Sequence, residues 1–157
     1  MRYEQRRRKV GADPAGRYNG GGTNSDEADQ PVNTWYAVTS DAYSYNGDGV
    51  CQDGARSYYT GHGVPCSTVV YNEDYTTNLT WDDGTVHTVR GVLGRTTGYA
   101  STQGDSGALV FVVTGASTRQ ARGQVSAGGS AGGYNLLFWT EAPDILNHYN
   151  LHLNPHT

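Results

Sequence analysis

Residues 103–113 read Gln-Gly-Asp-Ser-Gly-Ala-Leu-Val-Phe-Val-Val. A serine in a Gly-flanked turn is followed at once by Leu109–Val113, a continuous apolar run typical of a buried strand. A serine nucleophile needs such a tight turn, because small neighbours let its hydroxyl project from the backbone. The turn also lets the N–H groups of Gly104 and Ser106 converge on a developing oxyanion. The same residues would equally suit an ordinary surface turn before a strand.

The composition around this stretch predicts turn-dense β structure. The 157 residues include 22 Gly and 12 Tyr against 2 Phe and 1 Met, and 36% are hydrophobic. Glycine supplies turns, whereas aromatic and β-branched residues favour strands. This mix excludes a helical bundle, a coiled coil and a collagen-like chain, and the length suits one domain.

Short strands separated by turn signals are predicted along most of the chain. The predicted strands are Trp35–Thr39, Ser67–Tyr71, Asn78–Trp81, Val86–Leu93, Leu109–Val113 and Gln120–Ser126. Ala127–Gly133 is predicted to be a turn, because it is rich in glycine. Such a series favours a β-barrel or a β-sandwich.

One helix is predicted near the C-terminus. Apolar residues recur there at helical spacing, at Ala142, Ile145, Leu146 and Tyr149. We expect Thr140 to cap the start of this helix, Pro143 to lie in its first turn and Asn150 to end it.

The charges are distributed unevenly. Residues 1–17 carry six basic and two acidic residues, whereas the rest of the chain carries five arginines and thirteen acids. The acidic body offers no basic face for nucleic acid, and no apolar run reaches the ~18 residues of a membrane span. The basic run Arg6–Lys9 has no apolar core after it, so we expect no signal peptide there. We predict a disordered lead-in at 1–30 and one domain at 31–157.

Five landmarks, in order, resemble chymotrypsin-fold serine proteases of the bacterial, streptogrisin-like kind. They are Val50–Ser57 with Cys66, Thr88–Val92, Gly104–Gly107, Ser126–Gly129 and Tyr149–Leu153. The resemblance covers roughly residues 30–153 and implies an all-β fold. This would be an antiparallel Greek-key β-barrel, the second of the two barrels in that family, with a C-terminal α-helix. It also implies a serine endopeptidase that acts on polypeptides without a cofactor.

The resemblance assigns roles to individual residues. Ser106 would be the nucleophile, and the N–H groups of Gly104 and Ser106 would form the oxyanion hole. The implied substrate-binding residues are Ala100, Gln103, Ser126, Ala127 and Gly128. Ala100 stands where relatives carry a cysteine or an acid, so we expect the pocket to take a small or medium apolar side chain rather than Lys or Arg.

The resemblance also implies a disulfide between Cys51 and Cys66, and hence a secreted protein. A zinc site is not expected, because no further ligands cluster near this pair. The series His148, His152 and His156 is interrupted by Pro155, so we expect no metal there either. Gln52 replaces the basic residue that some relatives pair with the aspartate of the serine turn, which leaves the partner of Asp105 open.

The triad His and Asp of the family are not found. Nothing before Cys51 resembles the Thr-Ala-x-His-Cys phrase of the first barrel. We expect His62 to lie at the surface and His87 on a strand, with neither as the base. The expectation is therefore a truncated protease, inactive alone, whose base comes from an absent first barrel or a second chain.

The alternative is a non-catalytic secreted β-module that binds protein or glycan. Its binding surface would use aromatic residues, namely Trp35, Tyr43, Tyr45, Tyr58, Tyr59 and Trp81. Packing of these side chains against strands is the competing explanation of the aromatic content.

Overall fold

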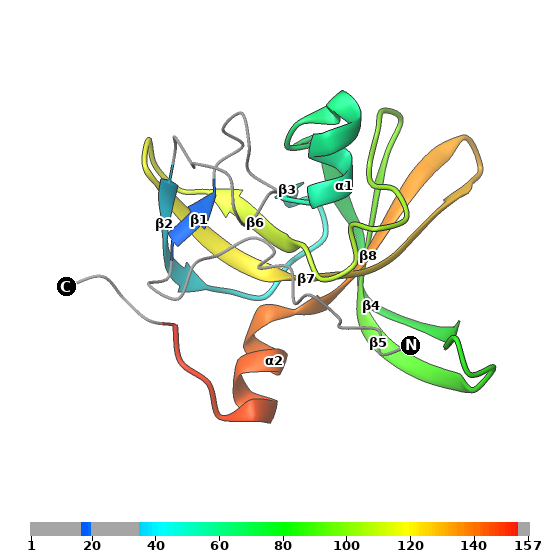
Figure 1. Ribbon diagram of the computed structural model, residues 1–157. Helices are drawn as coiled ribbons and strands as arrows, with labels where there is room; N and C mark the ends of the chain where they lie inside the picture. Colours follow the sequence, from blue (N-terminus) through cyan, green and yellow to red (C-terminus); the bar gives the residue numbers. More distant parts are fainter. Residues whose placement is uncertain (1–16, 20–34, 154–157) are drawn as a thin grey trace, which may run out of the picture.

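The computed structural model describes residues 17–19 and 35–153. The elements in chain order are strands β1 (Arg17–Asn19), β2 (Trp35–Asp41) and β3 (Gly49–Gln52), helix α1 (Ala55–Ser57), helical turn η1 (Tyr58–His62), strands β4 (Thr68–Thr80), β5 (Val86–Thr96), β6 (Leu109–Val113), β7 (Thr118–Ala131) and β8 (Tyr134–Glu141), and helix α2 (Ala142–Tyr149) (Figure 1). Of the predicted lead-in 1–30, only β1 lies among the described residues, and Arg6–Lys9 lies outside them. Within the described ranges, no helix is long and apolar enough to cross a membrane.

Six strands close into a ring. The sheet runs in the order β1-β2-β7-β6-β3-β4-β5-β8, and β8 pairs again with β7, so β3 to β8 form a closed barrel. All pairings within the ring are antiparallel, whereas β2 runs parallel to β7 outside it. Strands β3, β4 and β5 follow one another, and β6 returns beside β3, which makes a Greek key. The predicted Greek-key β-barrel with a C-terminal helix is confirmed.

Two apolar clusters hold the barrel together. The inner cluster consists of Val50, Val70, Val92, Ala100, Ala108, Val110, Val125, Leu137 and Trp139. The outer cluster joins the barrel to β2 and α2 through Val38, Cys51, Phe111, Ala121 and Ala142. Strand β6 contributes to both, because Val110 and Phe111 are buried on its opposite faces. The predicted strand at Leu109–Val113 is confirmed, but only Val110 and Phe111 of it are buried, and Val113 is 52% exposed.

Strand β8 follows a stretch that the sequence predicts to be a turn. Residues 127–131 instead continue β7, and the chain turns at Gly132 and Gly133, whose φ angles are 58° and 80°. The glycines of β7 pair with β8 through the backbone, as Gly128 does with Leu137. Glycine-rich stretches are typical of turns, so the composition indicated neither the end of β7 nor the start of β8.

The region from residue 67 to residue 96 forms one long hairpin. The two strands predicted at Ser67–Tyr71 and Asn78–Trp81 are parts of a single strand, β4, whose register with β5 shifts between Val70 and Tyr75. The β4–β5 hairpin extends from one side of the molecule, as does the β7–β8 hairpin (Figure 1).

The N-cap position of helix α2 lies one residue later than predicted, at Glu141. The prediction of a Thr140 cap is wrong, because Thr140 still belongs to β8, where it pairs with Gln124. Glu141 occupies the N-cap position without capping through its side chain. Its carboxylate instead accepts the backbone N–H of Ser44, at 3.1 and 3.3 Å from the two oxygens. Asn150 ends the helix in the left-handed conformation, as predicted.

Candidate active site

The serine turn lies on the connection from β5 to β6, residues 97–108, which completes the Greek key. Ser106 is exposed, whereas the neighbouring Asp105 is only 1% exposed, so the two side chains point to different environments. Gly104 and Gly107 have φ angles of 104° and 88°, in the left-handed region that favours glycine. These glycines let the backbone reverse on both sides of the serine.

The backbone amides of this turn divide into two sets. Asp105 N–H donates to the Thr102 carbonyl at 3.1 Å, and Gly107 N–H donates to the Val125 carbonyl at 2.8 Å. In the part of the chain that the structure describes, the N–H groups of Gly104 and Ser106 donate to no acceptor. Two amides that flank the serine are therefore available to an external oxygen atom.

The Asp105 carboxylate is held by neutral donors. Its Oδ1 accepts Ser57 N–H at 2.8 Å, and its Oδ2 accepts Thr102 N–H at 2.9 Å and the Gln52 amide at 3.4 Å. The Ser57 hydroxyl also donates to Oδ2. Burying a carboxylate destabilises the fold unless the group is hydrogen-bonded, and here four donors offset the loss of hydration. Gln52 therefore occupies the place expected for a cation, and it shares the role with Ser57 and Thr102.

A pocket of about 410 Å³ opens beside Ser106. Its lining consists of Ala100, Ser101, Thr102, Gln103, Ser106, Val125, Ala127, Gly128, Gly129, Ser130 and Asn135. Four of the five predicted substrate-binding residues lie in this wall, and no lining side chain is charged. A Cβ atom on Gly128 would approach Ser101 Oγ to 2.6 Å, so glycine at this position keeps the pocket open.

The fifth predicted residue, Ser126, lines a neighbouring cavity of about 690 Å³. Residues 79–83, at the end of β4 and in the turn that follows, also line this cavity and include Trp81. Ser106 and Ala127 border both cavities. The exposed serine therefore lies between an uncharged pocket and a more open cavity with an aromatic wall.

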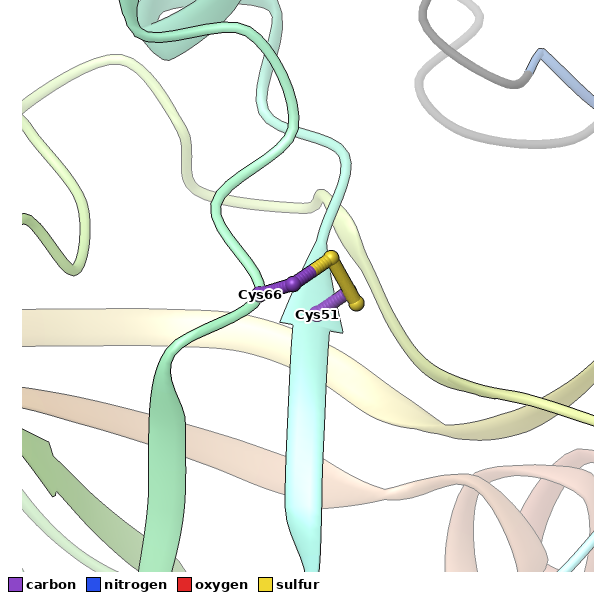
Figure 2. The surroundings of a disulfide bond; sticks show 2 residues. All are labelled: Cys51 and Cys66. Carbon is purple, nitrogen blue, oxygen red and sulfur yellow. A yellow bond between two sulfur atoms is a disulfide. The ribbon is translucent and has the colours of Figure 1, made fainter.

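The predicted disulfide between Cys51 and Cys66 is confirmed. It joins β3 to the segment just before β4, as Figure 2 shows. The enclosed loop contains Gln52 and Ser57, both of which donate to Asp105. The loop closed by the disulfide therefore also holds the serine turn.

The two histidines considered as bases stack on aromatic rings. The His62 ring stacks on Tyr99 with 3.6 Å between centroids, and the His87 ring stacks on Trp81 at 3.7 Å. His87 lies on β5, as expected. Within residues 36–153, no side chain hydrogen-bonds to Ser106 Oγ, and among the described residues no group of three His, Cys, Asp or Glu could hold a metal ion.

The same arrangement of strands occurs in solved bacterial proteases. Thermobifida fusca Protease A is 27% identical with a TM-score of 0.52, and the match covers 78% of this chain and 56% of that one. Cellulomonas bogoriensis chymotrypsin is 28% identical with a TM-score of 0.50, over 76% and 56% of the two chains. The chain has a chymotrypsin-like fold.

The chymotrypsin-like fold confirms the resemblance predicted from the sequence. Nocardiopsis protease adds a third structure, 25% identical with a TM-score of 0.52, over 77% of this chain and 55% of that one. The chain thus spans 55% to 56% of the length of these three proteins. Neither a protein-family model nor a curated protein sequence matches it.

Several residues of this candidate site are not indicated by any pattern in the sequence. Ser57 and Tyr99 are 42 residues apart, yet their hydroxyl oxygens lie 2.8 Å from each other. The pocket wall also includes Ser130 and Asn135, which are joined by a hydrogen bond of 2.9 Å across the β7–β8 hairpin. Contacts of this kind depend on how the Greek key brings distant segments together.

Proposed function

We propose that this chain carries the nucleophile and the substrate pocket of a chymotrypsin-like serine endopeptidase. Ser106 is the nucleophile, and the N–H groups of Gly104 and Ser106 form the oxyanion hole. The observation that carries this proposal is the pair of unused amides beside an exposed serine, on a turn held by a buried aspartate. Preorganised donors aimed at a developing charge are the largest single contribution to many acyl-transfer reactions.

The proposed reaction proceeds through an acyl-enzyme. The Ser106 hydroxyl oxygen attacks the carbonyl carbon of a peptide bond, and its proton passes to a base. The oxygen of the tetrahedral intermediate accepts hydrogen bonds from the two amides. The C–N bond then breaks as the base returns the proton to the leaving amine, and water hydrolyses the ester. In this proposal the base is a histidine from outside the described residues, on a first barrel or a second chain.

The proposed substrates are polypeptides with a small or medium apolar residue before the cleaved bond. The pocket beside Ser106 carries no charge to pair with Lys or Arg, and Ala100 at 2% exposure contributes a methyl group. Ser126, Ala127 and Gly128 on β7 would lie alongside the substrate backbone. An extracellular location is supported by the Cys51–Cys66 disulfide.

The proposal is tested by supplying the missing base as free imidazole. Purified protein is treated with a fluorophosphonate, which phosphonylates an activated serine, and adducts are located by peptide mass spectrometry. We expect little reaction without imidazole, because an unassisted serine hydroxyl is a poor nucleophile at neutral pH. With imidazole, Ser106 reacts faster than any other serine.

Two variants and two probes complete this experiment. Ser106→Ala removes the fast adduct, whereas Ser117→Ala, at an exposed position of the β6–β7 turn outside both cavities, keeps it. A probe with a leucine-like side chain reacts faster than a lysine-like one. If imidazole gives Ser106 no advantage over surface serines, the chain lacks a working oxyanion hole, and the non-catalytic module that binds protein or glycan replaces the protease proposal.

A further inference from the structure

The buried carboxylate of Asp105 is the group that fixes the serine turn, since both of its sequence neighbours are exposed. The amides of Gly104 and Ser106 can be aimed at one point only while the side chain between them stays in place. Among residues 36–153, whose side chains the structure describes, no Arg, Lys or His lies within ion-pair distance of this carboxylate. Its position therefore depends on neutral hydrogen bonds within the described structure.

The directions of these hydrogen bonds follow from chemistry. An ionised carboxylate only accepts, so the single hydroxyl proton of Ser57 points to Asp105 Oδ2. The Ser57 oxygen must then accept the hydroxyl proton of Tyr99, whose oxygen lies 2.8 Å away. It also accepts from the Gln52 amide at 3.0 Å. With one donation and two acceptances, the Ser57 hydroxyl has no free hydrogen-bonding capacity.

We propose that Tyr99 and Ser57 are positioning residues of the serine turn. The chain Tyr99 O–H to Ser57 O–H to Asp105 carboxylate holds the backbone of Gly104 and Ser106 in the geometry of an oxyanion hole. This inference rests on the proposed function, and it assigns to Asp105, whose partner the sequence left open, a chain of two hydroxyl groups. Hydrogen bonds in such a chain strengthen one another in a low-dielectric interior.

The two residues join separate parts of the fold. Ser57 belongs to the disulfide loop and is fully buried, whereas Tyr99 lies at the entry to the serine turn. His62, from the same disulfide loop, stacks on the Tyr99 ring at 3.6 Å and limits its rotation. The hydroxyl of Tyr99 is therefore fixed by ring stacking on one side and by Ser57 on the other.

Amide hydrogen exchange in Tyr99→Phe tests this proposal without any need for catalysis. Asp105 N–H donates to the Thr102 carbonyl within the turn, and Gly107 N–H donates to the Val125 carbonyl on β7, so their exchange rates report opening of the turn and its release from β7. We expect both rates to rise about tenfold, the effect of losing one hydrogen bond in a buried network. Gly84 N–H donates to the Trp81 carbonyl in the turn of the β4–β5 hairpin, outside the Tyr99–Ser57–Asp105 chain, and we expect its exchange rate to stay unchanged.

The matched control is Tyr59→Phe, because Tyr59 is 68% exposed on the neighbouring helical turn. It should leave all of these exchange rates unchanged. Ser57→Ala should reproduce the effect of Tyr99→Phe, and Ser57→Thr, which keeps the hydroxyl, should restore most of the protection. Equal acceleration at Gly84 would show general destabilisation instead, and unchanged exchange at Asp105 and Gly107 would overturn the proposal.

The imidazole-dependent reaction separates this inference from the function on which it rests. In Tyr99→Phe we expect the adduct at Ser106 to form about tenfold more slowly, with other serines unaffected. A wild-type protein that shows no such reaction refutes the protease proposal, while the exchange rates still decide the role of Tyr99. A normal reaction rate in Tyr99→Phe would show that the hydroxyl chain does not position the oxyanion hole.

Discussion

Replacement of Gly54 by alanine is the most direct perturbation of the Asp105 network. Gly54 lies at the start of α1 with φ −82° and ψ 125°, a conformation that alanine adopts without strain. A Cβ atom there would lie 2.3 Å from Asp105 Cγ and Oδ1 and 2.5 Å from Gln52 Oε1. The effect of Gly54→Ala is therefore steric, and it falls on the carboxylate beneath the serine turn.

The magnitude follows from how firmly that carboxylate is held. A flexible side chain could move aside, but Asp105 is short and accepts from Ser57, Thr102 and Gln52. Overpacking of a full core costs about 1–3 kcal/mol, and loss of a hydrogen bond to a charged group costs about 1.5–3 kcal/mol. We expect Gly54→Ala to lower the free energy of unfolding by about 4 kcal/mol, which lowers Tm by roughly 10 °C for a chain of this size.

Thermal unfolding followed by circular dichroism measures this difference. The matched control is Gly49→Ala, because Gly49 lies on β3 just before the disulfide loop and nothing stands within 4 Å of its added Cβ. We expect Gly49→Ala to unfold within a few degrees of the wild type. We also expect Gly54→Ala to lose the imidazole-dependent adduct at Ser106, because displacement of Asp105 moves the amides beside it.

A Gly54→Ala protein that unfolds together with the Gly49→Ala control, and that still reacts at Ser106, would refute this reasoning. Such a result would mean that the carboxylate of Asp105 moves freely and does not fix the turn. An unstable variant that nevertheless reacts normally at low temperature would separate the two roles of Asp105. It would then stabilise the fold without setting the oxyanion hole.

Two further predictions concern the rest of the molecule. The disulfide between Cys51 and Cys66 closes a loop with a sequence separation of 15. Replacing both cysteines by alanine should lower the free energy of unfolding, measured in urea, by about 3 kcal/mol, and a loss below about 1 kcal/mol would contradict this. Burial raises the pKa of Glu141, against the lowering effect of its hydrogen bonds from Ser44. Its carboxyl group therefore contributes stability below its ordinary pKa and loses that contribution as pH rises through the folded-state pKa. We expect the stability of the wild type relative to Glu141→Gln to fall as pH rises above the ordinary carboxyl range of about pH 4, and parallel stability curves would exclude this assignment.

The sequence predicted those parts of the fold that local patterns encode. The run Leu109–Val113 identified β6 to the residue, because its centre, at Val110 and Phe111, is buried on both faces and is therefore apolar. The serine turn was equally readable, since Gly104 and Gly107 are needed where φ is positive. The chymotrypsin-like order of landmarks then supplied the barrel, which single segments could not.

The remaining features depend on contacts between distant segments. Strand β8 was missed because the glycine-rich stretch before it, residues 127–133, is typical of a turn, whereas residues 127–131 continue β7 and pair with β8. The donors to Asp105 lie 48 and 53 residues earlier in the chain, at Ser57 and Gln52, with no periodic pattern to connect them. Thr140 was chosen as the helix cap from residue type, but the strand extends through it.

Strand β7 is bonded to the serine turn through its main chain and through one side chain, since Gln124 Nε2 donates to the Gly107 carbonyl at 3.1 Å. Gly107 N–H donates to the Val125 carbonyl at 2.8 Å, and Val125 N–H donates to the Ala108 carbonyl at 2.9 Å. Neither bond depends on which side chains β7 carries, whereas residues 127–130 of the same strand line the pocket. Substitutions at residues 127–130 can therefore reshape the pocket one residue at a time, while the bonds from Gln124 and Val125 to the serine turn stay in place.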